Sequence, residues 1–119
     1  ILAVTVLTSI SQEVLSDELN IKGRLEDQVL SLARQCKDCG GNGLVASPSE
    51  VQRLRQELGP SFTIVTPGIR PSWASVDDQS RISTPEQAIK NGSDYLVVGR
   101  PITSAKNPQD AARRITDEI

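Results

Sequence analysis

The sequence predicts an α/β fold made of about four strand–helix units. Short apolar runs alternate along the chain with segments in which apolar residues recur at helical spacing. The runs are apolar on both faces rather than alternating with polar residues, which is typical of parallel strands covered by helices. Glycine and proline mark the boundaries between these segments, so the order strand then helix repeats through the chain.

The predicted strands are four short apolar runs that begin at the start of the chain. They are expected at Leu2–Leu7, Leu44–Ala46, Phe62–Val65 and Asp94–Val98. The chain has no methionine and opens directly on the first of these runs. We therefore expect it to be the later part of a longer polypeptide.

Helical periodicity fills the intervals between the strands. Apolar residues at this spacing are Leu25, Val29, Leu32, Ala33 and Cys36, then Val51, Leu54 and Leu58, and finally Ala111, Ala112, Ile115 and Ile119. A shorter helical piece is expected over about Gln12–Leu19. Ser47–Glu50 and Thr84–Gln87 match a capping box with proline at the first helical position, and Asn107–Asp110 is a close variant.

Four strand–helix units admit two architectures, an open doubly wound sheet or half of an eight-stranded barrel. The Gly-x-Gly-x-x-Gly fingerprint of dinucleotide sites is missing, which disfavours the first. Four units cannot close a barrel, so the second requires an upstream half that pairs with Leu2–Leu7 and Leu96–Val98. No internal linker divides residues 1–119, which we treat as one unit.

Composition excludes several classes of function. The net charge of −2 provides no basic field, and only Phe62, Trp73 and Tyr95 are aromatic, so nucleic acid is not expected as a partner. No apolar run is long enough to span a membrane, and a cytoplasmic protein is expected. The absence of histidine rules out a Ser-His-Asp triad and histidine metal ligands in these residues. Cys36 and Cys39 fall at a helix end, which opposes thiolate formation, so neither a redox nor a metal site is predicted.

Two arginines follow glycines at the ends of the last two predicted strands. Arg70 follows Gly68, and Arg100 follows Gly99 directly. Carboxyl ends of parallel strands meet at one edge, and the loops after the last two strands of a barrel are the usual phosphate site. The sequence therefore predicts a phosphate-binding edge. The alternative is a surface arginine paired to a carboxylate.

The segment Gly68–Ser83 is longer than an ordinary loop between strand and helix, as binding lids often are. In that interpretation Arg70 holds a phosphate and Gln79 reaches it with its amide. A solvated surface loop is the alternative.

Thr8 and Ser9 end the first strand, where a hydroxyl binds a ligand or caps the next helix; Ser9 with Gln12 fits a capping box. The carboxylates nearest the predicted edge are Asp77, Asp78 and Asp94, but adjacent aspartates usually point apart, and no lysine ends a strand. The residues therefore indicate phosphate binding without a catalytic acid or nucleophile.

Several stretches in a fixed order carry a family resemblance: Val4–Ser9, Val65–Pro71, Asp78–Gln79, Arg81–Ile82, Thr84–Ala88 and Val98–Pro101. Together they resemble orotidine 5′-phosphate decarboxylase of the bacterial type. The resemblance implies a TIM (β/α)₈ barrel of the ribulose-phosphate-binding group. Residues 1–119 would be its C-terminal half, strands five to eight, with the N-terminal half absent from this chain.

The resemblance also implies an enzyme, a lyase that decarboxylates orotidine 5′-monophosphate to UMP in de novo pyrimidine biosynthesis. It implies no cofactor or metal, a homodimer, and a catalytic lysine and aspartate array in the upstream half. The resemblance also implies the substrate contacts. The residues expected at the phosphate are Arg70, Gln79, Gly99 and Arg100. Gln79 is expected to contact the pyrimidine as well, and Thr8 is expected to contact the pyrimidine ring. Trp73 and Val76–Asp77 depart from the family pattern. The alternatives are a non-catalytic phosphate-binding half-barrel module and another sugar-phosphate enzyme of the same barrel group.

Overall fold

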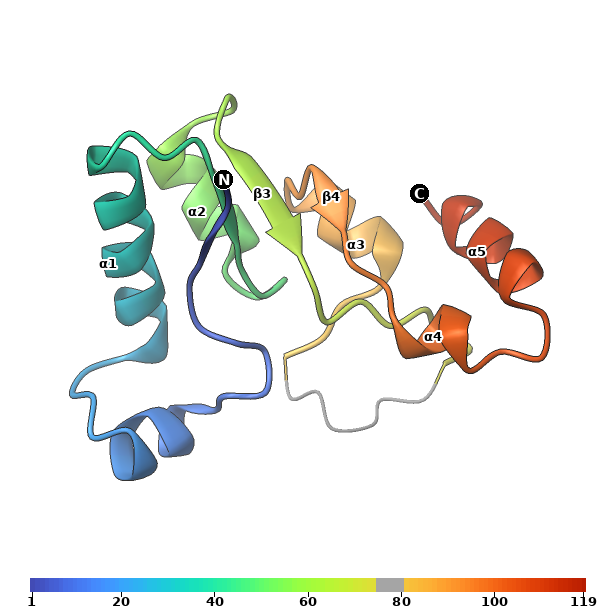
Figure 1. Cartoon of the computed structure of the whole chain (residues 1–119), viewed down its shortest axis with the longest axis horizontal. Helices are drawn as coiled ribbons and strands as arrows, with labels where there is room; N and C mark the ends of the chain where they lie inside the picture. Colours follow the sequence, from blue (N-terminus) through green and yellow to red (C-terminus); the bar gives the residue numbers. More distant parts are fainter. Residues whose placement is uncertain (75–80) are drawn as a thin grey trace.

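The computed structural model describes residues 1–74 and 81–119, which form a four-stranded parallel sheet and its helices (Figure 1). In chain order the elements are β1 (Ala3–Val4), the π-helix η1 (Val14–Glu18), α1 (Leu25–Asp38), β2 (Gly43–Val45), α2 (Val51–Leu58), β3 (Thr63–Thr66), α3 (Pro85–Lys90), β4 (Tyr95–Leu96), α4 (Arg100–Thr103) and α5 (Pro108–Thr116). The predicted alternation of strands and helices is confirmed. The two edge strands are shorter than predicted, and α4 was not predicted.

The strands follow one another in the sheet in the order β1-β2-β3-β4. Their register aligns Val4 with Val45, Val45 with Val65, and Val65 with Tyr95. These four side chains share one face, because side chains paired across parallel strands point to the same side. The opposite face carries Leu44 and Ile64, which are fully buried.

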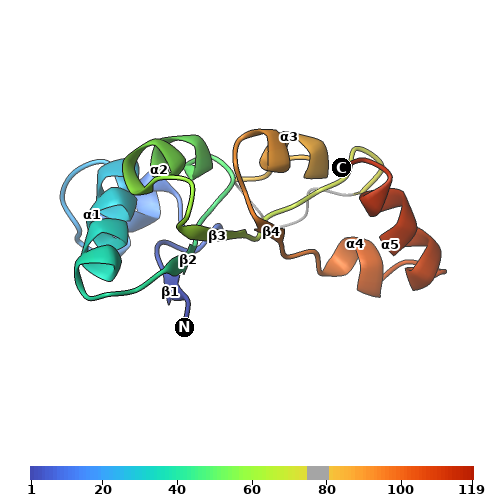
Figure 2. The same cartoon turned by 90° about the horizontal axis from the view of Figure 1, so that it is seen from above.

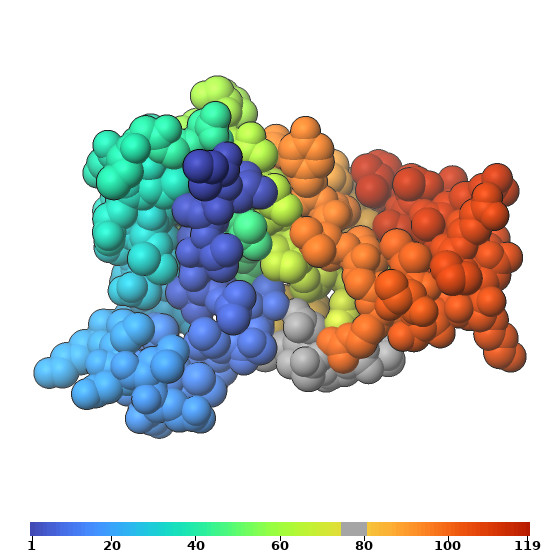
Figure 3. Space-filling model, viewed as in Figure 1, coloured from blue at the N-terminus to red at the C-terminus, as the bar shows by residue number. Residues whose placement is uncertain are grey.

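Only one face of the sheet carries packed helices among the described residues, an arrangement that fits the predicted half barrel better than an open doubly wound sheet. Figure 2 shows α1, α2 and α3 together on one side of the strands. The core on that side consists of Val6, Leu15, Leu25, Val29, Leu30, Ala33, Leu44, Ala46, Val51, Leu54, Leu58, Phe62 and Ile64. On the other face Val4 is 57% exposed and Tyr95 is 64% exposed. Figure 3 views this open face, with the N-terminal residues of β1 (dark blue) along one edge of the sheet.

The overall shape is flat, with extents of 42 × 34 × 22 Å and a radius of gyration of 14.8 Å. A compact domain of this length has a radius of gyration of about 13.5 Å. The described residues are therefore more spread out than a self-contained domain, which agrees with the open apolar face of the sheet.

Two predicted helix caps are confirmed and one is wrong. The hydroxyl of Thr84 accepts from the Gln87 N–H at 3.3 Å, and the amide oxygen of Asn107 accepts from the Asp110 N–H at 3.2 Å. In contrast, α2 begins only at Val51, and Glu50 makes no side-chain cap. The predicted N-cap, Ser47, therefore lies before the helix, where its hydroxyl accepts from the Ser49 N–H at 3.4 Å, and the Glu50 carboxylate binds Arg81.

Two smaller predictions are also corrected. The residue whose hydroxyl accepts from the Val14 N–H at the start of the first helical piece is Ser11, at 3.3 Å, rather than Ser9. The last helix buries Ala111 and Ile115, as predicted, but it ends at Thr116 and leaves Ile119 exposed.

Candidate functional site

Three strand ends converge on one hollow of about 260 Å³ at the carboxyl edge of the sheet. Its lining residues are Thr8, Pro67, Gly68, Arg70, Val97, Gly99 and Arg100. Thr8, Arg70, Gly99 and Arg100, which were predicted from separate stretches, are thus brought together. Gln79 lies outside the described residues.

Arg70 is held rigidly beyond the end of β3. Its side chain is buried, only 8% exposed, and its Nη1 donates to the carbonyl of Ile69 at 2.9 Å. Its backbone N–H donates to Ser83 O at 2.9 Å, and the Ser83 N–H donates to Gly68 O at 3.2 Å. Gly68 turns the chain with a φ of 78°, a conformation that favours glycine. The structure therefore excludes a solvated position for Arg70.

Gly99 and Arg100 form the opposite wall of the hollow, just beyond β4. Gly99 precedes α4, and Arg100 is its first residue and is exposed. A Cβ atom built on Gly99 would meet no atom within 4 Å, so the space beside this backbone is open. A ligand can therefore approach the main chain closely at this point.

The hollow carries two cationic side chains. The described residues that line it include Arg70 and Arg100 and no carboxylate. Guanidinium groups bind phosphate or carboxylate oxygens through paired N–H donors. Thr8, buried on the side of β1, adds a hydroxyl group. The arrangement suits an anionic ligand with a hydrogen-bonding part toward Thr8.

The remaining candidates of the sequence analysis have other roles or lie outside the described residues. Asp94 pairs with Arg55 at 2.6 Å and accepts from the Ile64 N–H at 2.7 Å, so it joins two elements of the fold. Cys36 packs against the core and Cys39 is an exposed free thiol. Asp77 and Asp78 lie outside the described residues. Within the described ranges no cluster of three or more potential metal ligands occurs, and no helix is long and apolar enough to cross a membrane.

A buried ion pair that was not predicted from the sequence lies near the Thr8 side of the hollow. Arg81 Nη1 lies 2.7 Å from Glu50 Oε1, with the two side chains only 13% and 5% exposed. Arg81 Nη2 donates to Leu7 O at 2.7 Å and to Val6 O at 3.2 Å. Burial raises the pKa of the Glu50 carboxyl, because desolvation outweighs the attraction of the guanidinium. No local signal predicts this pair, because its members are distant in the sequence.

A sheet of four parallel strands with helices packed on one face is the architecture of part of a (β/α)₈ barrel. Residues 1–115 match the family described as Orotidine 5'-phosphate decarboxylase / HUMPS family, and the chain belongs to that family. The resemblance noted from the sequence motifs is confirmed.

Relatives and solved structures agree with this assignment. The chain is 54% identical over 119 residues to orotidine 5′-phosphate decarboxylase of Syntrophomonas wolfei, a match that covers 99% of this chain and 50% of the relative. It is 51% identical to that of Heliobacterium modesticaldum, covering 100% of this chain and 49% of the relative. The crystal structure of orotidine 5′-phosphate decarboxylase from Lactobacillus acidophilus superposes with a TM-score of 0.80 at 45% identity, over 98% of this chain and 47% of that one. The chain spans about half the length of the curated relatives it matches.

Proposed function

We propose that this chain is the C-terminal half of an orotidine 5′-phosphate decarboxylase barrel and supplies its phosphate and pyrimidine contacts. The complete enzyme would convert orotidine 5′-monophosphate to UMP in pyrimidine biosynthesis. The observation that carries the proposal is the convergence of Thr8, Arg70, Gly99 and Arg100 on one cationic hollow. These are the residues that correspond to substrate contacts in the family to which the chain belongs.

The open face of the sheet supports the proposal of a half barrel. Val4 on β1 and Tyr95 on β4 are exposed apolar side chains on the face that carries no packed helix in the described part of the chain. In a closed barrel this face lines the interior, and the strands at both edges pair with further strands. The N-terminal half of the same enzyme is the partner that would supply them. A homodimer of the complete enzyme remains an expectation from the family.

The hollow would orient the nucleotide from its two ends. Arg70 and Arg100 would bind the phosphate with the Gly99 backbone, while Thr8 would contact the pyrimidine ring. Gln79 would reach both parts. Because Arg70 is held by contacts with the backbone, little side-chain entropy would be lost when phosphate binds.

This half would contribute to catalysis through binding energy remote from the reacting carbon. Phosphate binding fixes the pyrimidine against the lysine and aspartate array expected in the other half. That array would stabilise and protonate the carbanion formed when carbon dioxide leaves. No cofactor or metal is required in this scheme.

The test compares orotidine 5′-monophosphate with orotidine, which lacks the phosphate, in the complete enzyme that contains this chain. Arg100→Ala is expected to lower kcat/KM for the nucleotide roughly 30- to 1,000-fold, which corresponds to a loss of about 2–4 kcal/mol of transition-state stabilisation. The slow reaction of orotidine should not change, because it makes no phosphate contact. Arg34→Ala, at an exposed arginine paired with Glu57, is the matched control and should leave both substrates unaffected.

Each outcome separates the candidates. An unchanged kcat/KM for the nucleotide in Arg100→Ala would remove Arg100 from the phosphate role. Absence of turnover by the complete protein, together with binding of nucleoside monophosphates, would favour a non-catalytic module. Turnover of a different sugar phosphate would favour another enzyme of the barrel group.

A further inference from the structure

The buried pair of Arg81 and Glu50 connects two walls of the hollow that the sheet does not join directly. Thr8, which follows β1, forms one wall of the hollow (the Thr8 wall). Pro67, Gly68 and Arg70, which follow β3, form another (the Arg70 wall), and β2 lies between these two strands. Arg81 spans this interval at the carboxyl edge, since its guanidinium donates to the carbonyls of Val6 and Leu7. Thr8 is the next residue along the chain.

The other end of this link is fixed to the Arg70 wall. Two residues beyond Arg81, Ser83 pairs with the strand end: its N–H donates to Gly68 O and its carbonyl accepts from the Arg70 N–H. An isolated bridge aligns Ile69 with Ser83 in parallel. The stretch from Arg81 to Ser83 is therefore hydrogen-bonded to both walls.

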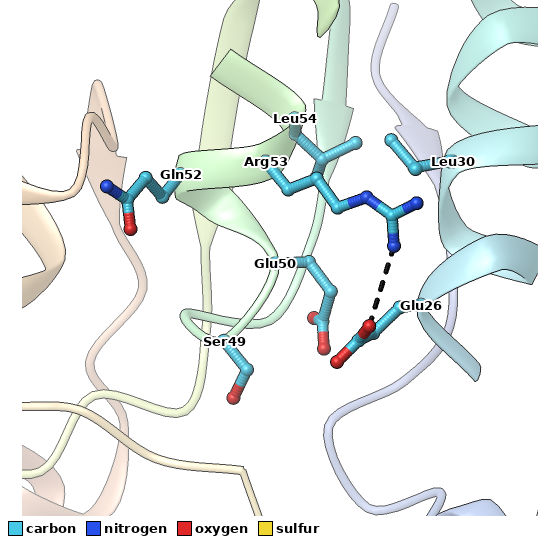
Figure 4. Close-up of a pocket in the computed structure, with 7 residues that line it drawn as sticks. All are labelled: Glu26, Leu30, Ser49, Glu50, Gln52, Arg53 and Leu54. Carbon is cyan, nitrogen blue, oxygen red and sulfur yellow. Dashed lines mark hydrogen bonds and ion pairs between the residues drawn. The ribbon is translucent and has the colours of Figure 1, made fainter. Parts of the chain in front are cut away.

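Glu50 makes the burial of this guanidinium possible. Its carboxylate sits at the start of α2, and Figure 4 shows it beside Glu26 of α1, which is bound by Arg53 from α2. The remaining oxygen of Glu50, Oε2, and the Nε of Arg81 are buried and make no hydrogen bond. Such a pair is a poor source of stability, because the desolvation of both charges opposes their attraction. The pair therefore matters less for stability than for the position in which it holds the Arg81 guanidinium against the carbonyls of Val6 and Leu7.

We propose that Arg81, oriented by Glu50, is a positioning residue that sets the separation between the Thr8 wall and the Arg70 wall. This inference rests on the proposed function, in which a nucleotide contacts both walls at once. A ligand that spans the hollow needs the correct separation, whereas a ligand that occupies only the phosphate end does not. The two kinds of ligand therefore distinguish positioning from general damage to the fold.

The experiment uses the complete enzyme and the variant Arg81→Lys, which keeps the charge but cannot bind Glu50 and both carbonyls together. We expect kcat/KM for orotidine 5′-monophosphate to fall about 10- to 100-fold. The affinity for UMP, measured by calorimetry, should fall with it. The affinity for ribose 5-phosphate should stay within about threefold, since the phosphate end is unchanged.

Two further variants keep the test decisive. Glu50→Gln preserves size and hydrogen-bonding capacity but removes the counter-charge, and should weaken UMP binding in the same selective manner, by less; it carries the test if Arg81→Lys does not fold. Arg53→Lys is the control, because Arg53 is an exposed arginine that binds Glu26 and Asp27 and touches neither wall. It should leave all three ligands unaffected.

Equal losses of UMP and ribose 5-phosphate affinity in the Arg81 and Glu50 variants would overturn the positioning role while leaving the proposed function intact. No change in either ligand would also overturn it. Failure of the parent enzyme to bind UMP would overturn the proposed function, and the positioning role with it.

Discussion

Residues 1–66 and residues 81–119 contain the same kind of strand–helix units, yet only the first region encloses a continuous core. Every member of the core cluster lies between Val6 and Ile64. In the second region the buried apolar side chains include Ala88, Ala111 and Ile115, and Tyr95 and Val97 are exposed. The difference shows that the same order of strand and helix gives different packing when the helices differ in length. The first region has α1 and α2 to cover its strands, whereas α3 and α4 in the second region are shorter.

The candidate site crosses the boundary between the regions. Thr8, from the first region, and Arg70, just beyond it, are buried and held by the fold, whereas Arg100 belongs to the second region and is exposed. A ligand in the hollow would therefore meet buried side chains at Thr8 and Arg70 and an exposed side chain at Arg100. Changes that weaken either region, or the links between them, test this contrast.

The largest effect is expected from the core of the first region. Leu54→Ala removes a side chain that is fully buried in α2, and it should lower the free energy of unfolding by about 2–5 kcal/mol. Ile115→Ala, in α5 outside the core cluster, should cost about 2 kcal/mol or less, because its surroundings can relax toward solvent. Urea denaturation of the complete protein measures both. Equal costs would contradict the contrast between the regions.

A smaller effect is expected at the contact between the segment after β3 and the last helix. Trp73 Nε1 donates to Glu118 Oε1 at 3.0 Å, and the Arg114 guanidinium lies 4.1 Å from the centre of the indole ring. Trp73→Phe keeps an aromatic face but removes the N–H donor, and should destabilise by about 0.5–1.5 kcal/mol. Thermal unfolding of the complete protein measures the loss, and Arg53→Lys, at an exposed arginine, is the control. A loss no larger than that of the control would show that Trp73 does not join the regions.

The smallest effect concerns pH and the link made by Glu50. Because burial raises the pKa of its carboxyl, the folded state holds the proton more tightly than the unfolded state. The resulting stabilisation is complete below the ordinary value of 4.5 and is lost as pH rises through the raised value. The free energy of unfolding should therefore decline with rising pH in this window. Arg81 and Ser47 oppose the rise in the Glu50 pKa, and Glu26 adds to it.

Replacement by glutamine should flatten this dependence, as measured by denaturation at a series of pH values. The exposed Glu57 provides a control of opposite sign, because its hydrogen bond to Arg34 lowers its pKa. Its contribution is present above the ordinary pKa of 4.5 and is lost as pH falls through the lowered value. A Glu50→Gln variant with the same pH dependence as the parent would remove Glu50 as the source.

The amino-acid sequence by itself determined the order of strands and helices, the caps at Thr84 and Asn107, and the two arginines at the sheet edge. Each of these depends on residues close together in the chain: apolar spacing, a side chain that binds a nearby N–H, or a glycine beside an arginine. The convergence of Arg70 and Arg100 followed from a general property of parallel strands, whose carboxyl ends meet at one edge.

Only the tertiary structure decided which face of the sheet is covered, and which charges pair. The strands are apolar on both sides, so the sequence gives no local sign that one face stays open. The exposed side chains of Val4 and Tyr95 mark that open face in the structure. The sequence Ser47–Glu50 fits a helix cap, but the carboxylate of Glu50 binds Arg81 instead, because packing brings a buried guanidinium within 2.7 Å. A buried charge is costly unless it is paired with an opposite charge. The folded chain can supply that partner from a residue that is distant in the sequence, as Glu50 is from Arg81.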